Sequence, residues 1–151
     1  DFQPLPGEEG IRAAIDEAGV PEGQYSFPHP GDPKKMGSPE HVEMMKSGPA
    51  GFLWILPRQQ GMTKQFIQWF VYCLVISVFV AYATGRTFPV GSEYLAVFRI
   101  AGVVAILAYS AASVPFAIWY GHTWSYTFKN VVDGVVYGLL TAGVFGWLWP
   151  A

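Results

Sequence analysis

Apolar and polar positions divide the chain into a mixed first part and an apolar second part. After residue 64, three long apolar stretches follow, at about 65–84, 94–114 and 131–149. A transmembrane helix needs about 20 mainly apolar residues, because each residue adds about 1.5 Å and the hydrocarbon core is about 30 Å thick. The pattern therefore predicts three transmembrane helices. Pro115 follows the second stretch and should bend or end that helix.

Two segments before residue 65 have the features of short helices. In 7–19 the apolar residues recur at helical spacing, and acidic residues occupy the first turn. In 38–48, Ser38 is placed to cap the N-terminus and Gly48 to end the helix. We therefore expect two short helices in this part.

Two further apolar runs, at 24–28 and 51–57, are bounded by Pro and Gly and are typical of strands. Four short elements can form only a small core, so we expect this part to depend on the membrane surface or on a partner. The predicted fold is mainly α: an integral membrane bundle of three transmembrane helices over 65–151. A small extramembrane segment over 1–64, α+β or irregular, precedes it.

Small residues recur at every fourth position in the first and third apolar stretches, and the middle stretch shows a looser version with steps of four and three. This spacing places them on one side of a helix, where a glycine costs up to about 1 kcal/mol in water. In a bilayer such faces let helix backbones approach and pack by dispersion. The predicted helix-packing positions are Cys73, Ser77, Ala81 and Gly85, then Ala101, Ala105, Ala108 and Ala112, then Gly134, Gly138, Ala142 and Gly146.

Composition agrees with a membrane protein, since 52% of the residues are hydrophobic and only 13% are charged. A soluble domain has about 25% charged residues. The net charge of −2 and the lack of a basic patch exclude nucleic-acid binding as an expected function. Cys73 is the one cysteine, so the chain forms no internal disulfide.

Aromatic residues support the count of three spans. Trp and Tyr collect at the two membrane interfaces, and three spans place them in two groups at opposite ends of the helices. Two spans would leave one group inside the hydrocarbon. The predicted interface anchors are Trp69, Tyr82, Tyr94, Arg99, Trp119, Trp124, Trp147 and Trp149.

Basic residues near the spans predict the orientation. One side has Lys46, Arg58, Lys64 and Lys129, whereas the other has Arg86 and at most Arg99. Because cytoplasmic loops carry an excess of Lys and Arg, the N-terminal segment of this multi-pass protein is expected to be cytoplasmic.

Two charged residues lie within the predicted spans. Arg99 can extend toward the headgroups, and Asp133 is expected in the first turn of its helix, where the helix dipole favours an anion. Charges within spans also line ion paths. A small oligomeric transporter or channel, with Arg99, Asp133 and Tyr109 lining the route, is therefore an alternative function.

The residues with ligand chemistry lie mainly in the first part. Thioethers and imidazoles together suit Cu(I), which makes a metal-handling membrane protein a further alternative. The residues in question are His29, Met36, His41, Met44 and Met45. Their irregular spacing favours packing, and we predict neither a metal site nor a cofactor. Walker, nucleophile-elbow and zinc-protease patterns are absent from the sequence, so we expect no enzymatic activity.

Several phrases of the sequence resemble a family of small uncharacterised bacterial inner-membrane proteins. The phrases are QYSFPHP, MGSPEHVEMMKSGPAGFLWILP, MTKQFIQWFVYCLVISVFVAYATGRT and VDGVVYGLLTAGVFGWLWP. The resemblance implies a soluble N-terminal segment followed by three transmembrane helices. It also implies a further hydrophobic segment before Asp1, which would bring the spans to four. It implies no activity and no functional residues.

The leading functional hypothesis is a non-catalytic accessory subunit that packs against a larger respiratory or photosynthetic complex. Three small-residue faces exceed what a bundle of three helices can bury against itself. The expected partners are other integral membrane subunits and lipids. On this hypothesis Gly138→Leu should detach the subunit without preventing its insertion.

Overall fold

The computed structural model describes residues 2–57 and 61–150, and the chain forms two compact units, Asp1–Gln60 and Gly61–Ala151. The first unit contains α1 (Glu8–Glu17), β1 (Gly23–Phe27), the 3-10 helix η1 (Pro33–Lys35), α2 (Pro39–Ser47) and β2 (Gly51–Ile55). The second contains α3 (Thr63–Thr87), α4 (Tyr94–Ser110), α5 (Ser113–Tyr120) and α6 (Trp124–Trp147). The chain is mainly helical, as predicted.

The first unit is a two-stranded sheet with short helices. β1 and β2 pair in antiparallel register, with Tyr25 opposite Leu53. Before α2, the Ser38 hydroxyl accepts a hydrogen bond of 3.2 Å from the backbone N–H of His41, as the capping pattern predicts. None of residues 2–57 is buried, so this unit has a very small hydrophobic core.

The second unit contains three helical segments that are long and apolar enough to cross a membrane. They are Thr63–Thr87, Tyr94–Tyr120 and Trp124–Trp147, with 25, 27 and 24 residues. At about 1.5 Å per residue each exceeds the roughly 30 Å of a hydrocarbon core. These spans indicate a multi-pass membrane protein.

The second span is interrupted between α4 and α5. Pro115 lies in the first turn of α5, where its missing N–H costs no helical hydrogen bond. The proline ring would clash with the carbonyl of Ala111 in a continuous helix, and α4 ends directly before that residue. Gly121, with a φ of 71°, ends α5 in the left-handed conformation.

The third span begins earlier than the predicted start at 131. α6 begins at Trp124, and the Thr123 hydroxyl caps it by accepting a hydrogen bond of 3.3 Å from the N–H of Tyr126. Asp133 therefore lies in the third turn, and the expectation that it lies in the first turn is wrong. The helix extends through polar residues that the apolar pattern does not include.

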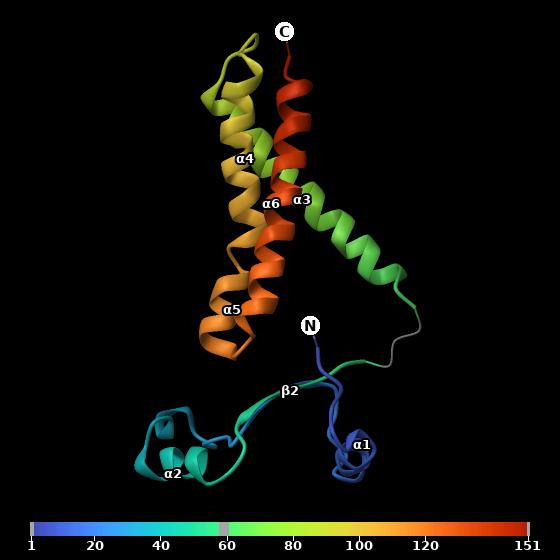
Figure 1. The fold of residues 1–151 in the computed structure, drawn as a ribbon, viewed down its shortest axis with the longest axis vertical. Helices are drawn as coiled ribbons and strands as arrows, with labels where there is room; N and C mark the ends of the chain where they lie inside the picture. The colour runs from blue at the N-terminus through green and yellow to red at the C-terminus, as the bar shows by residue number, and fades with distance from the viewer. Residues whose placement is uncertain (1, 58–60, 151) are drawn as a thin grey trace. The chain divides into compact units, whose positions relative to one another are not determined.

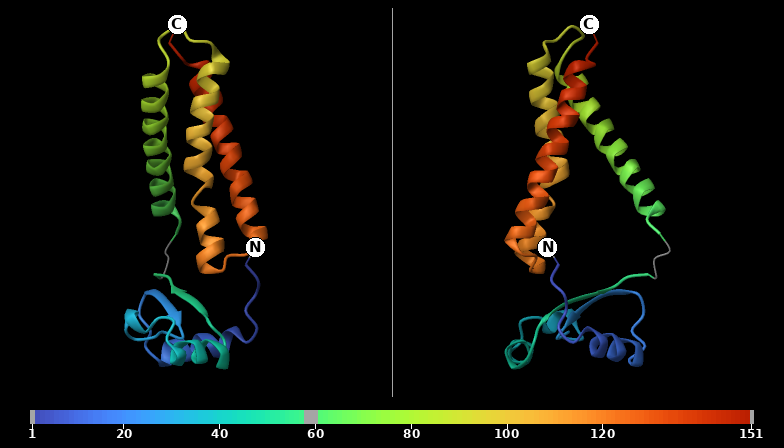
Figure 2. Two further views of the ribbon diagram at one scale, coloured as in Figure 1. Left: turned by 90° about the vertical axis from the view of Figure 1, so that its left-hand side faces the viewer. Right: turned by 45° about the vertical axis from the view of Figure 1, so that its right-hand side comes forward.

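The helix α4 and the longer helix α6 run side by side, and α3 crosses behind them (Figure 1). Near its C-terminal end α3 packs on α4, whereas toward its N-terminal end it diverges from the pair (Figures 1 and 2). The core of this unit is made of Ile76, Val80 and Thr84 from α3, Val97, Ala101, Gly102, Ala105 and Ser110 from α4, and Thr127, Gly134, Gly138, Ala142 and Gly146 from α6.

Two hydrogen bonds tie the loop between α3 and α4 to the C-terminal end of the chain. The N–H of Gly91 donates to the carbonyl of Pro150 over 2.9 Å. The indole Nε1–H of Trp149 donates to the carbonyl of Pro89 over 3.0 Å. These bonds hold the C-terminal end of α6 beside the N-terminal end of α4.

Candidate helix-packing site

The contact between α4 and α6 is close enough for backbone to meet backbone. All four predicted packing residues of α6 are buried in it: Gly134, Gly138, Ala142 and Gly146. A Cβ atom on Gly134 would lie 2.9 Å from the carbonyl carbon of Tyr109 and 3.0 Å from the backbone nitrogen of Ser110. Side chains do not tolerate such distances, so only glycine fits here.

Cβ atoms on two further glycines of α6, one and three turns along the helix, would also come too close to α4. A Cβ on Gly138 would lie 2.8 Å from the backbone nitrogen of Ile106 and 2.9 Å from its Cα. A Cβ on Gly146 would lie 2.8 Å from the ring of Tyr94. The glycines thus form a groove along α6 into which α4 fits.

On α4 the matching surface comes from three small residues. Ala101 and Ala105 are fully buried, as is Gly102, whose Cβ would lie 3.3 Å from that of Ala142. Gly102 belongs to this contact although the four-residue spacing passes over it. Its neighbour Ala101 was the signal that could have identified it, since adjacent small residues widen a flat face. The other predicted positions of this stretch are exposed: Ala108 and Ala112.

On α3 the buried line is formed by larger residues. Ile76, Val80 and Thr84 are buried and also follow a four-residue spacing. The predicted small residues lie beside this line: Cys73 and Ser77 are half-buried, and Ala81 and Gly85 are exposed. No atom outside the helix's own backbone and the adjacent residues lies within 4 Å of a Cβ placed on Gly85. The surface at Gly85, near the end of α3, is therefore open within the described chain.

Four aromatic rings join the three spans where α3 diverges. Trp69 and Tyr72 of α3, Tyr109 of α4 and Tyr137 of α6 form a closed cycle of ring contacts. Successive ring centroids are 5.5, 6.0, 5.8 and 5.9 Å apart, within the range of favourable aromatic pairs. Long side chains thus bridge the widening space between the helices.

Two hydroxyl groups of this aromatic cluster have protein partners, those of Tyr72 and Tyr109. The Tyr72 hydroxyl donates a hydrogen bond of 3.1 Å to the carbonyl of Ala108. The Tyr109 hydroxyl interacts with the side chains of Cys73 and Thr141. Tyr109 therefore has a structural role between the helices.

Several serine and threonine hydroxyl groups in the spans bond to helix carbonyls. Ser77 and Thr141 each donate to the carbonyl four residues earlier, over 2.9 Å. The Ser110 hydroxyl donates from α4 to the carbonyl of Val131 in α6 over 3.2 Å. Across residues 2–57 and 61–150, no buried side-chain nitrogen or oxygen lacks a partner.

The two charged residues of the spans predicted from the sequence lie on exposed surface. Arg99 is near the start of α4, and Asp133 is in the third turn of α6. Arg99 is ten residues from Tyr109 on the same helix, a distance of about 15 Å along the helix axis.

The predicted interface anchors lie near the ends of the helices and loops. One of them is half-buried, Trp149, through its bond to Pro89. The rest are exposed: Trp69, Tyr82, Tyr94, Arg99, Trp119, Trp124 and Trp147.

The two histidines of the first unit support turns. The Nδ1 atom of His29 accepts a hydrogen bond of 3.0 Å from the N–H of Gly31. The Nδ1 atom of His41 accepts from Gly37 over 3.3 Å, and its Nε2 atom lies 3.4 Å from the carbonyl of Pro28. Within the described residues, no group of three or more His, Cys, Asp or Glu side chains is placed to hold a metal ion.

Comparison with known proteins gives no relative of this chain. No protein-family model, no curated protein and no solved structure matches it.

Proposed function

We propose that this protein is a non-catalytic accessory subunit of a larger membrane complex, and that it docks through one face of α3. This face, called the outer seam, consists of Ile67, Val71, Leu74, Val78, Ala81 and Gly85. Its four larger residues are each at least half exposed, and Ala81 and Gly85 are exposed as well.

The spacing of the outer seam favours contact with another helix. Its six positions alternate steps of four and three residues, the repeat that keeps one stripe facing a partner helix. The stripe runs over most of α3, from Ile67 to Gly85. It lies on a different side of the helix from the buried line that begins at Ile76.

The small residues at one end of the outer seam allow close approach. Ala81 and Gly85 are one turn apart, which is the small-residue spacing found where membrane helices meet. The space around the Cβ position of Gly85 is open to 4 Å. A transmembrane helix with an apolar stripe is the partner that fits this surface.

The small-residue face of α6 is already used within the chain. Gly134 and Gly138 meet the backbone of α4, so they cannot receive a helix of another protein at the same time. Gly138→Leu would therefore disturb contacts within the chain, and we expect Gly85→Leu to be the substitution that detaches the subunit. The open seam of α3 is the single observation that carries the proposal.

We further propose that the protein resides in a bacterial inner membrane with its N-terminal segment in the cytoplasm. Lys64 at the start of α3 and Lys129 in the first turns of α6 belong to the same side of the spans. Arg86 belongs to the opposite side, at the end of α3. The positive charge near the spans supports this orientation.

Purification from the native membrane in mild detergent tests the proposal. The unsubstituted protein should carry a partner in fixed stoichiometry, and Gly85→Leu should lose it while remaining folded and monodisperse. Val103→Leu, on an exposed position of α4, is the matched control and should keep the partner. A folded monomer without a partner in all three samples would contradict the proposal.

A further inference from the structure

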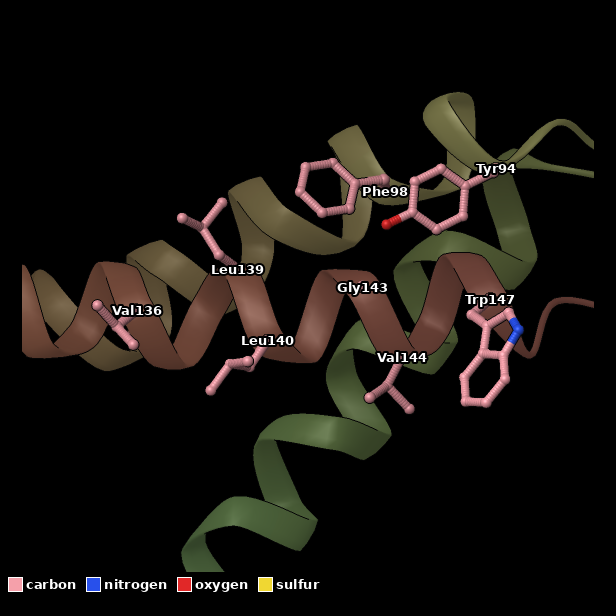
Figure 3. A pocket seen from close by; sticks show the side chains of 8 residues that line it. All are labelled: Tyr94, Phe98, Val136, Leu139, Leu140, Gly143, Val144 and Trp147. Carbon is pink, nitrogen blue, oxygen red and sulfur yellow. The ribbon is translucent and has the colours of Figure 1, made fainter.

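A second surface of the spans is a groove between α4 and α6, separate from the outer seam. It has a volume of about 480 Å³, within the range of ligand sites, and its exposed lining is almost wholly apolar. Figure 3 shows the residues that line it: Tyr94, Phe98, Val136, Leu139, Leu140, Gly143, Val144 and Trp147.

The groove has the length of one membrane leaflet. From Trp147, the last residue of α6, to Val136 it follows eleven residues, or about 16 Å. This is about half of a hydrocarbon core of roughly 30 Å. Tyr94 and Trp147 mark its outer end, where both helices reach the membrane interface.

The groove is open to the hydrocarbon along its length. Its lining is apolar, and it extends from the interface over about half of the hydrocarbon core. One hydrocarbon chain of a lipid leaflet has this length and this chemistry.

One polar group points into the groove. The Tyr94 hydroxyl lies 3.9 Å from a Cβ placed on Gly143 and is directed toward that glycine (Figure 3). Among the described residues it has no hydrogen-bond partner in the protein. Below it, the stacked rings of Tyr94 and Phe98, 5.7 Å apart, form an apolar wall.

We propose that this groove binds one acyl chain of a glycerophospholipid, whose ester carbonyl accepts a hydrogen bond from the Tyr94 hydroxyl. The ester of a phospholipid lies at the interface, at the level of Tyr94, and its acyl chain extends toward the middle of the bilayer. Gly143 provides the open floor along which the chain lies. This site does not depend on the proposed docking of α3.

A photoreactive phospholipid tests the site in the intact protein. The protein is placed in phosphatidylethanolamine and phosphatidylglycerol bilayers with a trace of ester-linked phosphatidylethanolamine that carries a diazirine midway along one chain. After irradiation, labelled residues are mapped by mass spectrometry. Labelling should concentrate at Leu140, Gly143 and Val144, and it should exceed that of the α3 residues Val78 and Phe79, which are at least about as exposed.

Two changes isolate the hydrogen bond. Tyr94→Phe should lower groove labelling by about three- to tenfold, which is the effect of losing one hydrogen bond. An ether-linked probe, which lacks the carbonyl, should give the same loss with the unsubstituted protein. With Tyr94→Phe the ether and ester probes should label equally, because the two changes remove the same interaction.

Filling the groove provides an independent test. The nearest atom to a Cβ on Gly143 is the Tyr94 hydroxyl at 3.9 Å, so Gly143→Leu fits the backbone and occupies the floor. It should abolish groove labelling, whereas Val103→Leu should not. The ester and ether comparison stays decisive even if Gly143→Leu does not fold.

Three results would overturn the proposal. The first is labelling of the groove no stronger than labelling of α3, which would mean ordinary lipid solvation. The second is equal labelling of the unsubstituted protein by the ester and ether probes. The third is the absence of lipid labelling in the groove, because a helix would then cover it.

Discussion

The contact of α4 with α6 and the contact of α4 with α3 use different chemistry on helices of similar apolar character. Glycines of α6 let two backbones touch, so α4 and α6 stay together along their length. On α3, Ile76, Val80 and Thr84 keep the backbones apart, and aromatic rings fill the widening space. In a bilayer, dispersion at close range decides which helices associate firmly. The α4–α6 pair is therefore the rigid part of the unit, and α3 is the part with unused surface.

The most damaging change to the firm contact is Gly138→Leu. Its side chain would overlap the backbone of Ile106, so the two helices must separate. We expect a loss of about 3 kcal/mol or more in the free energy of unfolding, at or above the usual cost of overpacking. Reversible unfolding in bicelles measures this loss. If Gly138→Leu were as stable as the unsubstituted protein, the α4–α6 contact would be no firmer than the α4–α3 contact.

Two glycine-to-alanine substitutions in α6 test whether close approach of the backbones stabilises the α4–α6 pair. Gly134→Ala puts a Cβ 2.9 Å from backbone of α4 and should lower the free energy of unfolding by about 1 to 3 kcal/mol. Gly143→Ala, with 3.9 Å to its nearest atom, should be neutral or stabilise by up to about 1 kcal/mol through helix propensity. The same unfolding assay should separate them, and equal effects would show that backbone approach is unimportant.

The hydrogen bond between α4 and α6 should contribute less to the free energy of unfolding than the glycine contacts. Ser110→Ala removes the donor to the Val131 carbonyl and should lower the free energy of unfolding by about 0.6 kcal/mol, the mean for such bonds in membranes. Ser77→Ala, which removes a hydroxyl that bonds within its own helix α3, is the control for losing a hydroxyl. A loss from Ser110→Ala several times larger would mean that polar bonding holds the pair together.

The smallest effect on stability is expected on α3. Gly85→Leu meets open space, so the free energy of unfolding should change by no more than about 0.5 kcal/mol, as at an ordinary surface site. The measurement is the same assay on the isolated protein. A large loss would mean that Gly85 packs within the chain, and the outer seam would then be shorter than proposed.

The helices and strands could be predicted well from the sequence, because local signals determine them. Ser38 caps α2 and Pro115 interrupts the second span, each through a property of the residue itself. The start of α6 could not be predicted from the apolar pattern. The helix is capped at Thr123 and continues through polar residues such as Lys129 before its apolar stretch begins. A search for apolar residues alone misses such an extension.

The packing faces were harder to predict, for a geometric reason. In α6 the glycines leave one possible contact face. In α3, two four-residue lines run beside each other, one through Ser77 and one through Ile76, and spacing does not distinguish them. The helix buries the larger residues because its partner stays at side-chain distance. The open groove at Tyr94 depends on two helices at once, so neither stretch reveals it.

If the outer seam of α3 is a docking surface and the exposed residues of α4 face lipid, crosslinking to a partner should occur from α3 alone. In a Cys73→Ala background, a benzophenone on Val78→Cys is compared with one on Val103→Cys, two exposed valines in neighbouring spans. After irradiation in the native membrane, we expect a discrete protein adduct from position 78 and none from position 103. Adducts from neither position, or equally from both, would contradict it.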